Sequence, residues 1–289
     1  MESECKIDCD ISYDIVSDLL GLTMLVYDYG KKFTVEPKQT IESFISTIHQ
    51  NSDILSSLSE SRQEVIKRLA RTSAHGKVVN FISEKETDIQ VGITTSELNK
   101  RISIVFRGSE SKADWYHDLK IIKYKLDNGV YVHKGFYDQL HTNGVYNRIL
   151  TLLRVLLNAV PDYSIYVCGH SLGAALSTLC GYELSRDIPN KITVVNFASP
   201  RVGNNGFKEE CNKKTNLCIY RITNDRDIVT CAPFINYKHV GTNIHVSESN
   251  INIYKDCSYP WWMYSLWRCW RVSDHDVDLY YTRLKKHKW

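Results

Sequence analysis

The alternation of apolar runs with helical segments between residues 164 and 223 constrains the fold of this chain more than any other feature. Apolar runs at 164–168, 191–197 and 217–223 have the length and β-branched content of buried strands. A helical pattern rich in small residues follows Ser171, between the first two runs. Strands that alternate with helices form mostly parallel sheets, because each crossover lays its helix on a face of the sheet. We therefore predict an α/β fold with a mostly parallel central sheet and helices on both faces.

The chain before this region has a different pattern. Apolar residues at helical spacing predict helices at 11–27, 41–48 and 60–72, and a further helical pattern covers 134–158. Short β runs begin near residue 78, with VVNFI, DIQVGIT and RISIVF. No repeat or Pro/Gly-rich linker divides the chain. We expect a helical N-terminal segment, residues 1–85, packed on an α/β domain, residues 86–289, as one folding unit.

A serine flanked by glycines stands where the first of the parallel strands ends. The segment is Gly169-His170-Ser171-Leu172-Gly173, with a β run before it and a helical pattern after it. A nucleophile on a tight strand-to-helix turn needs neighbours without side chains, so that the strand and the helix approach closely and the hydroxyl projects outward. The motif predicts Ser171 as a nucleophile, and the alternative is a serine that only caps the helix.

A nucleophilic serine needs a histidine to take its proton and an acid to orient that histidine. In the α/β-hydrolase arrangement the acid follows a later strand and the histidine comes last. Asp225 and Asp227 both follow the run at 217–223, and at this level both remain candidates. Among the later histidines, His275 lies at a loop-to-helix junction and is the best candidate for the base.

The other histidines fit other roles better. His170 lies inside the glycine-flanked turn beside the serine, and we expect it to point elsewhere. His245 has β-like neighbours and His287 is near the C-terminal end, so we expect surface or packing roles. His239 precedes Val-Gly in a segment that reads as a strand.

Several further motifs occur in a fixed order along the chain. They are IVFRGS at 104–109, Asp114-Trp115, VHKGF at 132–136, FASPRVGN at 197–204, DIV at 227–229 and YKHVG at 237–241. Together with the serine motif and His275, they resemble the class 3 lipase family over residues 88–285. That family has the α/β-hydrolase fold and includes fungal triacylglycerol lipases, plant phospholipase A1-type enzymes and diacylglycerol lipases.

The resemblance implies a catalytic triad of Ser171, Asp227 and His275. Asp227 matches because the acid of the family directly precedes Ile-Val. The family often continues with a proline where this chain has Thr230, and this departure keeps Asp225 as an alternative.

The resemblance also implies an oxyanion hole. Ser109 matches the Ser/Thr position of the family that follows Arg-Gly, and its backbone N–H and hydroxyl would face the oxyanion. The backbone N–H of Leu172 would be the second donor.

Tryptophan is unevenly distributed, because four of the six tryptophans lie within ten residues. They are Trp261, Trp262, Trp267 and Trp270, between the predicted acid and the predicted base. With Arg268 and Arg271 beside them they fit the interface of a membrane or lipid droplet, although an aromatic cluster that covers a sheet edge fits them equally.

In fungal members of the family a helical lid follows the Arg-Gly-Ser strand. This resemblance would make Trp115 the apolar tip of a lid, and a position in the core is the alternative.

The remaining composition narrows the class of protein. The formal net charge of +3 argues against nucleic-acid binding by charge. The nine cysteines include no Cys-x-x-Cys pair, and we expect neither a zinc site nor any other metal or cofactor. We expect reduced thiols, no signal peptide and no transmembrane helix, which favours an intracellular, cytoplasmic location. The C-terminal TRLKKHKW is basic, which fits either a solvated helix end or contact with anionic lipid.

These observations predict a serine hydrolase that cleaves carboxyl esters of lipids through an acyl-enzyme. A soluble esterase for short or aromatic acyl esters is the first alternative. A non-catalytic lipid-binding protein that keeps the fold is the second, and the complete set of triad residues argues against it.

Overall fold

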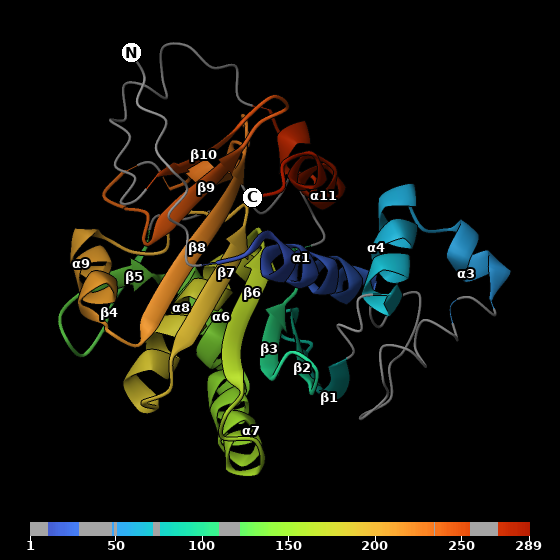
Figure 1. Ribbon diagram of the computed structural model, residues 1–289. Coiled ribbons are helices and arrows are strands. Elements are labelled where there is room, and N and C mark those ends of the chain that lie inside the picture. The colour runs from blue at the N-terminus through green and yellow to red at the C-terminus, as the bar shows by residue number, and fades with distance from the viewer. Residues whose placement is uncertain are drawn as a thin grey trace.

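The computed structural model describes residues 11–28, 48, 51–71, 76–109, 122–233, 235–254 and 271–289. Its centre is an eight-stranded sheet with the order β1-β2-β3-β6-β7-β8-β9-β10 (Figure 1). The strands are β1 (Gly76–Glu84), β2 (Ile89–Ser96), β3 (Arg101–Phe106), β6 (Ser164–His170), β7 (Ile192–Phe197), β8 (Leu217–Asn224), β9 (Thr242–Val246) and β10 (Ile251–Tyr254). A separate two-stranded sheet consists of β4 (Lys123–Lys125) and β5 (Tyr131–His133).

The five strands from β3 to β9 in the sheet order pair in parallel, and antiparallel strands extend both edges. The prediction of an α/β fold with a mostly parallel central sheet is confirmed. All six residues of β3 are buried, because helices cover both faces of the sheet at its centre.

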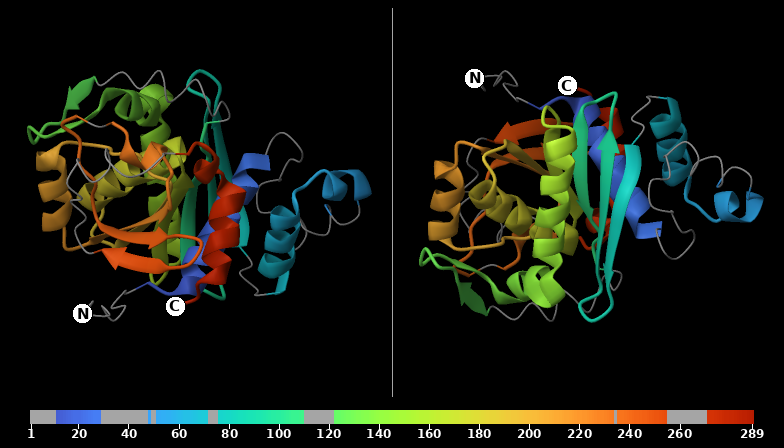
Figure 2. Two further views of the ribbon diagram at one scale, coloured as in Figure 1. Left: turned by 90° about the horizontal axis from the view of Figure 1, so that it is seen from above. Right: turned by 90° about the horizontal axis from the view of Figure 1, so that it is seen from below.

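Helices cover the two faces of the sheet in two groups (Figure 2). On one face lie α6 (Lys134–His141), α7 (Val145–Ala159) and α8 (Leu172–Asp187). On the other face lie α1 (Tyr13–Asp28) and α11 (Val277–Lys286). The helix α4 (Glu60–Arg71) packs against both of these helices. The remaining described α-helices are α3 (Ser52–Ser56) and α9 (Asn205–Lys213).

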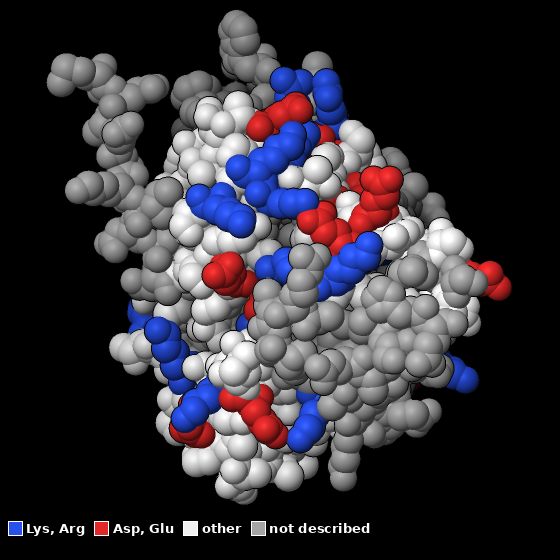
Figure 3. Space-filling model, turned by 45° about the vertical axis from the view of Figure 1, so that its right-hand side comes forward, with Lys and Arg blue, Asp and Glu red and all other residues white. Residues whose placement is uncertain are grey.

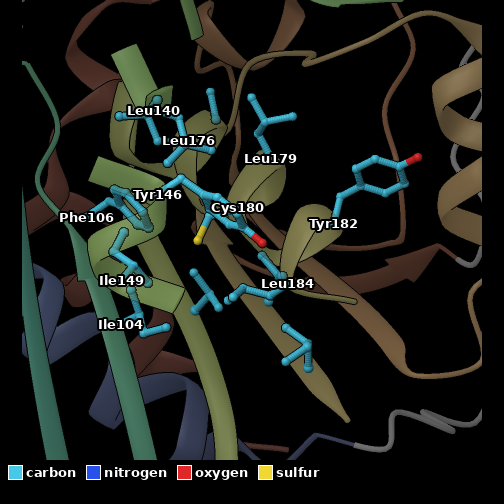
Figure 4. Packing of buried hydrophobic residues seen from close by; sticks show 14 of the residues in the cluster. Ile104, Phe106, Leu140, Tyr146, Ile149, Leu176, Leu179, Cys180, Tyr182 and Leu184 are labelled. Atoms are coloured by element: carbon cyan, nitrogen blue, oxygen red, sulfur yellow. The ribbon is translucent and has the colours of Figure 1, made fainter. Parts of the chain in front are cut away.

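The packing on the α8 face is dense (Figure 4). Leu176, Leu179 and Cys180 of α8 are almost fully buried, and Ile104 and Phe106 of β3 belong to the same cluster. Gly181 lets the helix lie close to the sheet, because an added methyl group there would come within 2.3 Å of a Val194 methyl. This close packing fixes the start of α8 at the carboxyl edge of the sheet.

One predicted helix is divided in the structure. The helical pattern at 134–158 forms two helices, α6 and α7, separated at Thr142–Gly144. Asn143 and Gly144 both have positive φ, at 51° and 68°. An α-helix does not accommodate this conformation, so the apolar spacing continues across a turn that the periodicity does not reveal.

Other expectations map directly onto described elements or fall outside them. The predicted helices at 11–27 and 60–72 correspond to α1 and α4. The predicted helix at 41–48 lies outside the described residues apart from residue 48. Within the described part of the chain, no helix is long and apolar enough to cross a membrane.

Candidate active site

The glycine-flanked serine lies on a sharp turn between β6 and α8. Ser171 has φ 60° and ψ −123°, and its backbone N–H donates to the Phe197 carbonyl at 3.0 Å. A methyl group added at Gly169 would lie 2.4 Å from the Gly173 carbonyl oxygen, and one added at Gly173 would lie 2.5 Å from the Phe106 carbonyl oxygen. Only glycine permits these approaches, so the motif produces the strained turn that presents a nucleophile.

The structure brings Ser171, His275 and Asp227 together in one hydrogen-bonded chain. The His275 Nε2 atom lies 2.7 Å from the Ser171 hydroxyl oxygen. Its Nδ1 atom lies 3.0 and 2.9 Å from the two carboxylate oxygens of Asp227. All three residues are buried. With its proton on Nδ1 donated to the carboxylate, His275 presents a lone pair on Nε2 to the serine hydroxyl.

The carboxylate of Asp227 is fully buried and accepts two further hydrogen bonds. The Val229 backbone N–H donates to Oδ1 at 3.0 Å, and the Tyr280 hydroxyl donates to Oδ2 at 2.7 Å. Burial and the adjacent Asp227 charge raise the pKa of Tyr280 well above its usual value, so the phenol keeps its proton. Sequence reasoning did not single out Tyr280, because its spacing in α11 shows burial and not the partner of its hydroxyl.

Asp225 occupies a different environment. Its side chain is 30% exposed, and the Arg226 guanidinium lies 4.0 Å away. Asp227, and not Asp225, is the acid that contacts His275 in the described structure.

The other histidines lie away from the Ser171 hydroxyl. His245 contacts the Thr223 hydroxyl through Nδ1, and His287 contacts the Ser247 carbonyl through Nε2. His239 lies between strands in a loop, where Nε2 donates to the Thr230 carbonyl at 2.6 Å. Burial, with the positive charges of Arg221 and Arg201, holds the pKa of His239 well below its usual value.

Ser109 and Leu172 lie near the carboxyl ends of two adjacent parallel strands. Phe106 pairs with Gly169 across β3 and β6, so each of the two residues comes three positions after this pair. Ser109 is half-buried. Leu172 is the first residue of α8, where a backbone N–H has no acceptor within its own helix. The register therefore brings both backbone segments to the edge where Ser171 stands.

The predicted lid and interface residues fall outside the described part of the chain. They are Trp115, Trp261, Trp262, Trp267 and Trp270. Among the described residues, no group of three or more His, Cys, Asp or Glu side chains is arranged to hold a metal ion.

The basic C-terminal residues lie beside acidic or aromatic partners. Arg283 pairs with Asp274, Lys285 with Glu64 and Lys286 with Glu248, while Lys288 lies over the Tyr13 ring. On the face turned forward in Figure 3, basic and acidic side chains are interspersed. The local excess of positive charge that the TRLKKHKW segment suggests is thus largely balanced in the fold.

Comparisons with known proteins find similarity to lipases and to a phospholipase A1. Residues 103–237 match the family described as lipase (class 3). The chain is 31% identical over 201 residues to phospholipase A1-II 3 of Oryza sativa subsp. japonica, covering 58% of this chain and 47% of that protein. It is 28% identical over 190 residues to a lipase of Rhizomucor miehei, covering 63% of this chain and 52% of that protein. The chain therefore spans about half the length of the curated relatives it matches.

Solved structures match over nearly the whole chain. The Rhizomucor miehei triacylglyceride lipase superposes with a TM-score of 0.70 at 21% identity, covering 92% of this chain and 96% of that one. A mutant form of MDLA from Penicillium cyclopium gives a TM-score of 0.70 at 23% identity, covering 87% of this chain and 90% of that one. At these identities the likeness establishes the fold, which is that of the fungal lipases.

Proposed function

We propose that this chain, which resembles class 3 lipases over residues 103–237 and has their α/β-hydrolase fold, is a serine hydrolase that cleaves carboxyl esters of lipids. The observation that carries the proposal is the continuous hydrogen-bonded chain from Ser171 through His275 to Asp227. A buried carboxylate, a histidine and a hydroxyl in this order form the arrangement that makes a serine nucleophilic.

In the proposed reaction, the Ser171 oxygen attacks the acyl carbonyl while His275 Nε2 takes the hydroxyl proton. The carboxylate of Asp227 stabilises the resulting imidazolium and holds its Nδ1–H. The backbone N–H groups of Ser109 and Leu172, with the Ser109 hydroxyl, stabilise the oxyanion. His275 then gives its proton to the leaving alcohol, and the acyl group remains on Ser171. A water molecule, deprotonated by His275, releases the fatty acid and restores the serine.

The relatives support the substrate class. Their names describe lipases, phospholipases A1 and a secreted mono- and diacylglycerol lipase. The ester of an acylglycerol or phospholipid is the chemistry these names share, and we propose it for this chain. Peripheral contact with a membrane or lipid droplet is part of the proposal, supported by the sequence cluster of Trp261, Trp262, Trp267 and Trp270.

Two further points of organisation belong to the same proposal. We propose that residues 1–85 and 86–289 fold as one unit, supported by the contacts of α1 with β3 and β6 and by the pairing of β1 with β2. We also propose an intracellular location, supported by the free thiols of Cys168, Cys180, Cys211 and Cys218.

A fluorophosphonate probe and an ester chain-length series test the function. The wild type should react with the probe at Ser171 and hydrolyse long-chain p-nitrophenyl esters faster when liposomes are present. Ser171→Ala should lose both activities, while Ser83→Ala, at an exposed position on β1, should keep them. Failure of the wild type to react at Ser171 would refute the catalytic proposal. Equal rates for short and long chains, with no effect of liposomes, would instead indicate a soluble esterase.

A further inference from the structure

His170, the residue beside the nucleophile, makes two hydrogen bonds that the triad does not include. It is the last residue of β6 and only 4% exposed. Its Nε2 atom lies 2.9 Å from the backbone carbonyl oxygen of His275. Its Nδ1 atom lies 2.8 Å from the hydroxyl oxygen of Tyr27, near the end of α1. The side chain therefore links the main chain of the base to the N-terminal helix.

The partners of His170 determine where its proton lies. A carbonyl oxygen only accepts hydrogen bonds, so Nε2 carries the proton and donates to His275. In the neutral ring Nδ1 is then an acceptor, and the Tyr27 hydroxyl donates to it. Burial raises the pKa of Tyr27, which keeps the phenol protonated as this role requires.

A neutral His170 ring also favours the protonation of the adjacent His275 ring. The His170 and His275 rings lie 4.7 Å apart between centroids. His275 becomes positively charged when it takes the serine proton, and a second charged imidazole at this distance would oppose that step. A proton fixed on Nε2 of a neutral ring avoids the repulsion.

Tyr27 also contacts the backbone immediately before Ser109. A methyl group added at Gly108 would lie 1.9 Å from the Tyr27 hydroxyl oxygen, so a glycine is required there. The Tyr27 hydroxyl thus contacts the backbone next to Ser109 and, through His170, is linked to the backbone of His275.

We propose that Tyr27 and His170 are positioning residues, through which α1 holds the His275 main chain in register with Ser171. This inference rests on the proposed function. The His275 ring reaches both Ser171 and Asp227 only from a fixed backbone position. A displacement of about 1 Å at such a site lowers the rate by as much as 10²-fold. A hydrogen bond from the residue next to the nucleophile constrains that position directly.

Single and double substitutions test the inference. Tyr27→Phe should lower kcat about tenfold and leave KM within about twofold, because substrate contacts are unchanged. His170→Ala should lower kcat about 10²-fold, and His170→Gln, whose amide N–H still reaches toward the carbonyl, should recover part of that loss. In the His170→Ala background, Tyr27→Phe should have a much smaller effect than in the wild type, because Tyr27 acts on the base through His170. Tyr13→Phe, at the other end of α1, is the matched control and should keep the wild-type kcat.

Two kinetic results would overturn the proposal. One is a Tyr27→Phe variant with the kcat of the wild type, and the other is multiplicative losses in the double variant. Nitrogen-15 NMR of histidine-labelled protein gives a readout that does not depend on turnover. The His170 signals should show a neutral ring with its proton on Nε2 in the wild type, and a ring protonated on Nδ1 would also overturn the proposal. If the wild type proves inactive, the NMR result still decides the geometry while the proposed function fails separately.

Discussion

Replacing Asp227 by Asn, with Asp225→Asn as the matched control, tests the assignment of the acid. The Val229 N–H donates to Oδ1 of Asp227, so an amide at this position would keep its oxygen there and place its NH₂ group at the Oδ2 site. That NH₂ group would then face His275 Nδ1, 2.9 Å away in the wild type. A donor at this place favours the histidine tautomer with its proton on Nε2, which cannot accept the proton of Ser171.

The size of the effect follows from the same distance. A carboxylate and an imidazolium 2.9 Å apart attract by about 6 kcal/mol at an effective dielectric constant of about 20. Losing that stabilisation in the transition state corresponds to a fall of about 10⁴ in kcat. Asp225→Asn should stay within about twofold of the wild type, because its side chain is partly exposed and pairs weakly with Arg226.

The assay measures kcat for a p-nitrophenyl ester, with circular dichroism to show that both variants are folded. A larger loss in Asp225→Asn than in Asp227→Asn would refute the assignment. A loss below about tenfold in a folded Asp227→Asn variant would refute the electrostatic reasoning.

Three further predictions concern the oxyanion residue, the turn and pH. Ser109→Ala should lower kcat by about 10²-fold with an unchanged melting temperature, and an unchanged kcat would remove the Ser109 hydroxyl from the oxyanion hole. Gly173→Ala should destabilise the fold by about 1–3 kcal/mol in urea unfolding, because its methyl group would meet the Phe106 carbonyl, whereas Gly92→Ala makes only ordinary contacts and should cost less. The depressed pKa of His239 means that the unfolded chain binds its proton more readily, so the unfolding free energy should fall as pH drops below 6.5, by at most about 1.4 kcal/mol per unit. His239→Gln should reduce that slope between pH 7.5 and 5.5, and an identical slope would contradict the argument.

The parts of the site that sequence predicted are those in which local chemistry dictates local geometry. The glycines around Ser171 are required because an added methyl group would lie only 2.4 or 2.5 Å from a backbone carbonyl oxygen, so the motif and the turn imply each other. The parallel sheet was predictable for a similar reason, because strands buried on both faces, such as β3 with its sequence RISIVF, are rich in apolar residues.

The parts that sequence missed depend on contacts between distant segments. Helical spacing in α11 shows that Tyr280 is buried, but not that its hydroxyl donates to Asp227. The same holds for Tyr27 in α1, whose partner His170 lies 143 residues away. The residues around His239 predicted a strand, whereas His239 lies in a loop and donates to the Thr230 carbonyl. Hydrogen-bond partners of this kind follow from the tertiary fold and leave no periodic signal.

The packing of α1 against α11 has a consequence for how activity arises during folding. The serine and its base are 104 residues apart, and α1 adds a contact across 143 residues. Pairings between such distant segments form slowly, because the entropy of closing long loops opposes them. Recovery of ester hydrolysis during refolding should therefore lag behind recovery of helix signal. In this protein, the rate at which turnover recovers would report the last tertiary step of folding and not the collapse that precedes it.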